Sequence, residues 1–120
     1  MELDLTPLEW DWTPVTKGDT FPSIRIQETS SDVDCARVRV KIKASGVATA
    51  ALELDSDASG ITITDGTAGA WDFTIDTITA AQTASLSAGF YTYDIETTDA
   101  AGNVKTEFCG TWQILPQITD

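Results

Sequence analysis

The sequence contains no histidine, and this absence removes several kinds of chemistry at once. Ser/His/Asp and Cys/His nucleophilic sites, histidine metal sites and the commonest general acid or base all need an imidazole. No glycine-rich phosphate loop precedes a helix pattern either. Paired carboxylates could still hydrolyse glycosides, but the acidic residues lie mainly at turns and on outward strand positions. We therefore expect a protein with no catalytic residues and no cofactor.

Basic residues are also scarce: seven stand against 19 acidic residues, which gives a formal net charge of -12. A chain with this charge repels phosphate backbones and anionic lipid headgroups. No apolar run approaches the roughly 18 residues of a membrane span. The opening MELDLTPLEW lacks the basic head and apolar middle of a secretory signal. We expect neither nucleic acid nor a membrane as a partner.

Only two cysteines are present, Cys35 and Cys109, too few for a disulfide-rich scaffold and too far apart in sequence for a zinc site. Both fall in phase with the charged side chains of their strands. A disulfide between them would therefore have to form on the outer face of a sheet. We expect two free thiols, as in a protein made in a reducing cytoplasm.

Strict alternation of apolar and polar residues dominates the sequence and is typical of strands with one buried face. In CARVRVKIK, residues 35–43, the inward positions begin at Ala36 and the basic side chains take the other face. In VKTEFCGTWQIL, residues 104–115, the inward positions begin at Val104. Further strands are predicted in TFPSIRIQET (20–29), VATAALEL (47–54), GITIT (60–64), AWDFTID (70–76) and FYTYDIETT (90–98).

Turn residues separate these runs, and only TAAQTASL, residues 79–86, suits one or two helical turns. The pattern predicts an all-β fold: an antiparallel, immunoglobulin-like β-sandwich of about seven strands with one short helical connection. A closed barrel is the competing architecture. At 120 residues we expect one such domain, over residues 17–120, after an N-terminal segment or docking arm at residues 1–16.

The stretch DSDASG, residues 55–60, matches the first half of an EF-hand calcium loop at Asp55, Asp57 and Gly60. The match then fails, because Gly66 stands where the loop needs a bidentate glutamate and the intervening ITIT alternates like a strand. We interpret the stretch as a turn between two strands and expect no metal. A structural calcium ion is the alternative.

Four of the seven basic residues form a stripe on one predicted strand: Arg37, Arg39, Lys41 and Lys43. One interpretation is that they pair across strands with acidic residues such as Asp94, Glu96 or Glu53. The other is that the stripe docks an acidic neighbour, including another copy of the same chain.

The leader LEWDWTP, residues 8–14, raises a similar choice at Trp10 and Trp12, whose indoles carry enough apolar area to anchor a contact. One interpretation makes the leader the first strand of the chain's own sandwich. Since the strand pattern closes without residues 1–14, the other makes it an arm that docks on an adjoining subunit.

The order of motifs along the chain is a further signal. KGDTFPSIRI (17–26) opens with Gly-Asp and an apolar strand, and GITITDGTAGAWDFTI (60–75), GFYTYD (89–94), a Gly-Asn turn (102–103) and GTWQI (110–114) follow. In this order the motifs resemble small β-sandwich proteins and domains of tailed bacteriophages, including the N-terminal domain of upper baseplate proteins from phages of Gram-positive bacteria. The resemblance implies a virion part without catalytic residues, made in the host cytoplasm and held by protein contacts.

We therefore expect a non-enzymatic structural component of a tailed-phage virion. Its expected role is a multi-copy tail, baseplate or fibre-attachment adaptor that binds other virion proteins and copies of itself, and capsid decoration is a further role for the same kind of sandwich. The alternative is an immunoglobulin-like binding module of a bacterial surface protein or adhesin.

Overall fold

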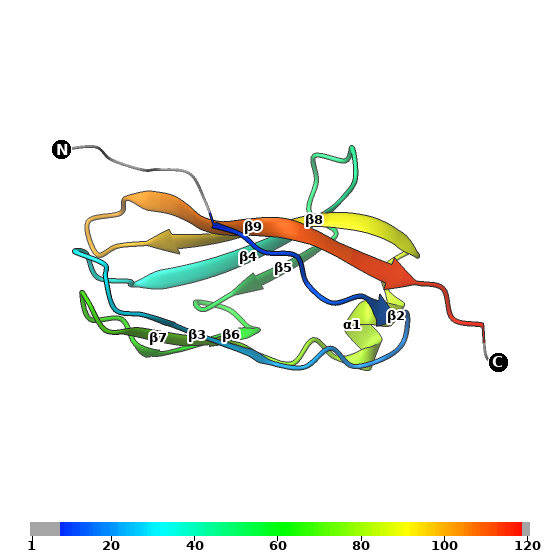
Figure 1. Ribbon diagram of the computed structural model, residues 1–120, viewed down its shortest axis with the longest axis horizontal. Helices are drawn as coiled ribbons and strands as arrows, with labels where there is room; N and C mark the ends of the chain where they lie inside the picture. Colours follow the sequence, from blue (N-terminus) through cyan, green and yellow to red (C-terminus); the bar gives the residue numbers. More distant parts are fainter. Residues whose placement is uncertain (1–7, 119–120) are drawn as a thin grey trace.

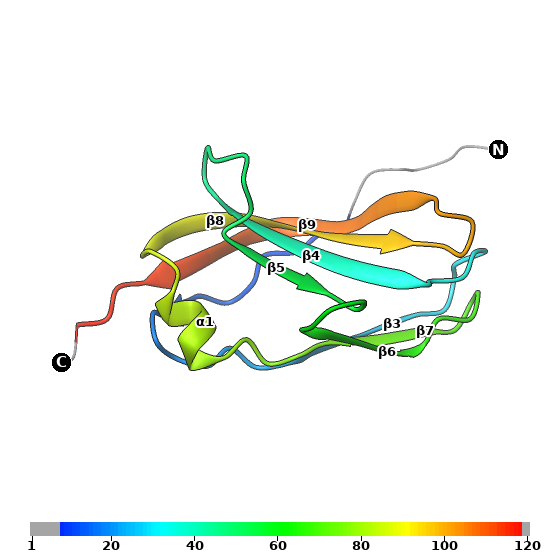
Figure 2. The same cartoon turned by 180° about the vertical axis from the view of Figure 1, so that it is seen from behind.

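The computed structural model describes residues 8–118, whose strands form two stacked sheets (Figure 1, Figure 2). The larger sheet has the strand order β1-β9-β8-β4-β5, with β2 also pairing with β9, and the smaller has the order β3-β7-β6. The larger comprises β1 (Leu8–Glu9), β2 (Val15–Thr16), β4 (Arg37–Ala44), β5 (Leu52–Asp55), β8 (Gly89–Thr98) and β9 (Val104–Leu115). The smaller comprises β3 (Ile24–Glu28), β6 (Ile61–Asp65) and β7 (Trp71–Ile75). This arrangement confirms the predicted β-sandwich and excludes the closed barrel.

The core lies between the sheets, and the alternation read from the sequence builds it. Val38, Val40 and Ile42 of β4 are fully buried, while the basic residues between them face outward. Val40 lies opposite Ile95 of β8, and Ile42 lies opposite Tyr93, in an antiparallel ladder. Among the described residues, every pairing of named strands is antiparallel except those of β1 and β2 with β9.

The predicted helical turns are confirmed as α1 (Ala80–Ala84), which closes one end of the sandwich (Figure 2). The hydroxyl of Thr79 accepts the N–H of Gln82 at 3.2 Å, and the Gln82 side chain accepts the N–H of Thr79 at 2.8 Å. The buried hydroxyl of Thr83 donates to the backbone of the turn at residues 18–19 at 2.7 Å and accepts from it at 3.1 Å. No helix among residues 8–118 has the length and apolar character needed to cross a membrane.

The predicted burial of Val104 is wrong, because β9 contains a bulge. Ile95 lies opposite Phe108, whereas the next residue, Glu96, lies opposite Thr106, so β9 carries one extra residue at this point. An extra residue shifts the alternation of the side chains that follow or precede it. Val104, expected inward, is therefore 61% exposed.

The expected orientation of Cys35 and Ala36, just before β4, is also wrong. Ala36, expected inward, is exposed, and Cys35, expected on the outer face, is buried. The strand begins only at Arg37, and the N–H of Cys35 instead donates to the carbonyl of Gly66 at 2.7 Å. Both cysteines are free thiols, as expected, and burial raises the pKa of Cys35 to about 11.

The bulge generates a stability prediction for two apolar residues near the same end of the sandwich. Ile95→Ala should lower the free energy of unfolding by about 2–5 kcal/mol, because Ile95 is fully buried. Val104→Ala should change it by less than about 0.5 kcal/mol, because Val104 faces water. Urea unfolding of both variants measures the difference, and equal losses would show that the alternation of β9 is unbroken.

Candidate functional site

The N-terminal segment, residues 8–16, runs parallel to β9 and forms the edge of the larger sheet (Figure 1). The N–H of Trp10 donates to the carbonyl of Cys109 at 2.8 Å, and that of Trp12 donates to the carbonyl of Thr111 at 2.9 Å. The described part of the leader is thus a strand of the chain's own sandwich. Residues 1–7 of the expected arm lie outside the described residues.

The carbonyl of Trp10 fits into a notch formed by β8 and β9. A Cβ atom at Gly110 would lie 2.0 Å from this oxygen, so only glycine leaves room for it. The hydroxyl of Tyr93 donates a hydrogen bond to the same oxygen. Burial raises the pKa of Tyr93, with the Asp11 carboxylate adding to the effect, so the phenol stays a donor across the ordinary pH range.

Trp12 belongs to an aromatic cluster between the sheets. Its ring stacks on Tyr93 with the centroids 4.1 Å apart, meets Trp112 edge-on at 5.4 Å and stacks on Phe21 at 5.5 Å. Only 4% of Trp12 is exposed. The expectation that Trp12 is available to a partner is therefore wrong, because this side chain fills the core of its own sandwich.

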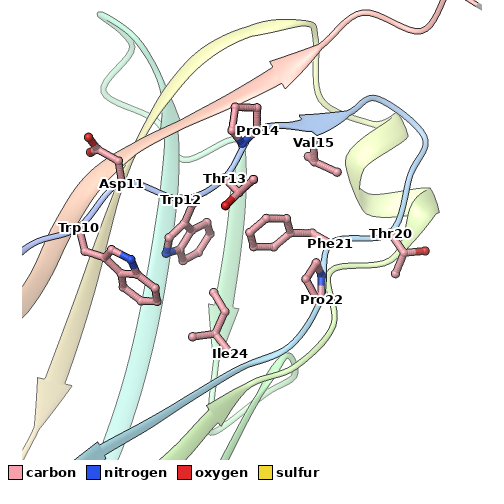
Figure 3. Close-up of a pocket in the computed structure, with 10 residues that line it drawn as sticks. All are labelled: Trp10, Asp11, Trp12, Thr13, Pro14, Val15, Thr20, Phe21, Pro22 and Ile24. Atoms are coloured by element: carbon pink, nitrogen blue, oxygen red, sulfur yellow. The ribbon is translucent and has the colours of Figure 1, made fainter.

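Trp10 has the opposite environment: 40% of it is exposed, and it lies at a groove of about 390 Å³ (Figure 3). One wall is the N-terminal segment at residues 10–15, and the other is the chain that leads into β3, at residues 20–24. The exposed apolar surface comes from Trp10 together with Pro14, Pro22 and Ile24. Alternation did not identify Pro14, Pro22 and Ile24 as groove residues, because it gives the face of a strand and not the distance between two edges.

The indole Nε1 of Trp12 is buried and has no hydrogen-bond partner among the described residues. In Figure 3 this nitrogen points towards the side of the groove where the Trp10 indole lies. The indole N–H of Trp112, in contrast, donates to the carbonyl of Thr13 at 3.1 Å. This buried nitrogen lies beside the Tyr93 ring, on which the Trp12 ring stacks, and it is not part of the open surface of the groove.

Two acidic side chains border this edge. Glu9 and Asp11 alternate with the tryptophans along the segment, and both residues are exposed. One carboxylate oxygen of Asp11 accepts the N–H of Thr111 at 3.0 Å, which fixes this charge beside β9. The edge therefore presents apolar and negatively charged side chains in turn.

The stripe of Arg37, Arg39, Lys41 and Lys43 lies on the outer face of β4, and the strands β9 and β8 separate β4 from the N-terminal segment that borders the groove. Arg37 binds Asp55 through its Nε at 3.0 Å, Arg39 binds Glu96 at 3.2 Å, and the Lys41 ammonium lies 4.0 Å from Glu96. Lys43 makes no ion pair among residues 8–118. The cross-strand interpretation is confirmed for three of the four residues, and the structure does not bring the stripe and the two tryptophans together.

The calcium-like stretch is a turn, as interpreted from the sequence. A carboxylate oxygen of Asp55 accepts the N–H of Asp57 at 2.9 Å, and the N–H of Asp55 donates to the carbonyl of Ser59 at 2.9 Å. Gly60 takes the left-handed conformation, at a φ of 98°. Arg37 lies against both carboxylates, 3.3 Å from that of Asp57, so a guanidinium neutralises them.

Comparisons with known proteins leave the family open. No family model matches the chain, and no curated protein matches it. Among solved structures, CopC from Methylosinus trichosporium OB3b aligns with 95% of this chain and 88% of its own, at 10% identity and a TM-score of 0.45. The sialic acid binding region of a Streptococcus sanguinis SK1 adhesin aligns with 96% of this chain and 31% of its own, at 18% identity and a TM-score of 0.43. A mutant of the SrpA adhesin from Streptococcus sanguinis aligns with 87% and 54%, at 12% identity and a TM-score of 0.40. TM-scores this low carry no argument about function.

The close approach of the Trp10 carbonyl to Gly110 predicts that a methyl group at position 110 lowers the stability of the fold. Gly110→Ala should lower the free energy of unfolding by about 1–3 kcal/mol, because its Cβ collides with the Trp10 carbonyl and forces the N-terminal segment away from β9. Thr111→Ala, the neighbouring exposed position, is the matched control and should have little effect. Denaturant unfolding with near-ultraviolet circular dichroism measures both, and a Gly110→Ala variant with unchanged stability and aromatic signal would rule the notch out.

The Arg37 ion pair predicts a pH effect. The hydrogen bond from Arg37 holds the pKa of Asp55 below its ordinary value. A carboxyl whose pKa falls on folding stabilises the fold above its unfolded pKa of about 3.9, and this contribution is lost as the pH falls through the lower folded value. Arg37→Gln should therefore raise the pKa of Asp55 and weaken the acid dependence of stability.

Carbon-13 NMR titration of the Asp55 carboxyl tests this effect directly. Lys43→Gln is the control, since it removes a charge from the same strand without removing an ion pair of the described residues. A pKa of Asp55 that moves equally in the two variants would mean that general charge, and not the Arg37 contact, sets it.

Proposed function

We propose that this chain is a non-catalytic module that works through protein–protein contacts, as a multi-copy structural component of a tailed-phage virion. The observation that carries the contact role is the groove at Trp10. A concave apolar surface with an exposed indole, lying between two open sheet edges, is the kind of surface on which protein contacts concentrate.

The virion assignment is supported by the order of motifs. The stretches that resemble phage sandwich domains correspond to the core elements of this fold: GITIT and WDFTI are β6 and β7, and GFYTYD and GTWQI belong to β8 and β9. The charged groups of the β4 stripe serve the fold itself, through ladders to Asp55 and Glu96. In this proposal the protein is assembled in the host cytoplasm with other virion proteins and copies of itself.

One observation favours a second candidate, a binding module of a bacterial surface protein. The exposed indole of Trp10 at the mouth of a groove is also a surface on which a sugar ring can stack. Saturable binding of a sialylated or neutral glycan that is lost in Trp10→Ala would favour this candidate over the virion role.

The multi-copy role predicts self-association. Static light scattering of the purified chain should give a mass that rises above the 12.9 kDa of one copy as the concentration increases. The same series on Arg39→Glu/Lys41→Glu tests whether the outer face of β4 contributes. A mass that stays at one copy up to millimolar concentration would contradict the multi-copy role and leave a monomeric binding module.

A further inference from the structure

The groove at Trp10 lies where both sheets end. The larger sheet ends at the N-terminal segment, and the smaller ends at β3, which pairs only with β7 among the described strands. Figure 3 shows the two walls on either side of the gap, with Trp12 and Phe21 between them. The opening is therefore bordered on both sides by extended backbone.

The N-terminal wall has one backbone donor, the N–H of Asp11, that does not bind its own sheet. The N–H groups of Trp10 and Trp12 face β9 and donate to it. Between these two residues, the N–H of Asp11 donates no backbone hydrogen bond among the described residues. The carbonyl of Thr13 faces inward, where it accepts from the indole N–H of Trp112. An open edge of this kind accepts a further extended chain through main-chain hydrogen bonds.

The groove also has room for side chains of such a chain. Its volume of about 390 Å³ suits one or two large apolar side chains, and the exposed indole of Trp10 offers them a flat surface.

Charge determines which chain fits. Glu9 and Asp11 lie exposed on this edge, and the whole chain has a formal net charge of -12. Three of the basic residues that could offset them, Arg37, Arg39 and Lys41, already pair with acids on the outer face of β4. The edge therefore attracts a basic segment and repels an acidic one.

We propose that the groove between the N-terminal segment and β3 binds an extended, lysine- or arginine-rich segment of another protein, which places a large apolar side chain against Trp10. The inference deepens the proposed contact function by naming the site and the chemistry of the partner. It requires no self-association of this chain.

Isothermal titration of the full chain, at a concentration at which light scattering gives the mass of one copy, tests the inference. The probe is a heptapeptide, Lys-Val-Lys-Phe-Lys-Val-Lys, and the matched acidic peptide carries glutamate in place of every lysine. The basic peptide should bind and the acidic one should not. Trp10→Ala should weaken binding by at least about tenfold, as expected for an indole at the centre of a contact.

Two variants separate the groove from general attraction of a cation to an acidic protein. Phe90→Ala removes another exposed aromatic side chain, 64% exposed on the outer face of β8, and should leave binding unchanged. Glu9→Gln/Asp11→Asn should weaken binding severalfold and reduce its dependence on salt. Amide shifts of the unmodified protein, mapped by NMR, should concentrate at residues 9–15 and 20–24, which checks the site without any variant.

Equal weakening by Trp10→Ala and Phe90→Ala, equal binding of both peptides, or shifts spread over the β4 face would overturn the inference. So would glycan binding at Trp10 without peptide binding, or occupation of the groove by a second copy. Self-association in light scattering with no peptide binding would overturn the inference and leave the proposed virion role standing. Peptide binding by a strictly single-copy chain would support the inference and contradict the multi-copy virion role.

Discussion

The stacking of Trp12 on Tyr93 is the contact on which the edge of this sandwich depends. Within residues 8–118, β1 and β2 are two residues each and pair with β9 alone, so their ladders by themselves hold little of the N-terminal segment. The indole placed between Tyr93, Trp112 and Phe21 joins that segment to the core. Gly110 and the Tyr93 hydroxyl then fix the Trp10 carbonyl, which sets Trp10 at the groove.

The distribution of charge follows from the same architecture. On the outer face of the larger sheet, the basic strand β4 lies between β5 and β8, each of which supplies acids to it. These ladders pair three of the seven basic residues with acids within the fold. The remaining negative charge includes the sheet edge at Glu9 and Asp11, which is also the edge with an apolar groove. Shape and charge thus point to one surface.

Much of this fold could be predicted from the sequence, because alternation alone identifies the buried faces of β4, β7 and β8. It failed where the backbone leaves the regular ladder: at the bulge before Phe108, and at Cys35, which precedes the strand. Alternation could not predict that Trp10 is exposed and Trp12 buried, because the two residues occupy equivalent alternating positions. Their difference in exposure comes from Phe21 and Trp112, neighbours that are distant in sequence.

Hydrogen exchange of the backbone amides at the N-terminal segment tests the central claim most directly, namely that residues 8–16 complete the sandwich and leave one edge open. The amides of Trp10 and Trp12, which donate to β9, should be protected together with the core strand β8, whereas those of Asp11 and Thr13 should exchange rapidly. Rapid exchange of all four amides in a chain whose core remains protected would contradict the account.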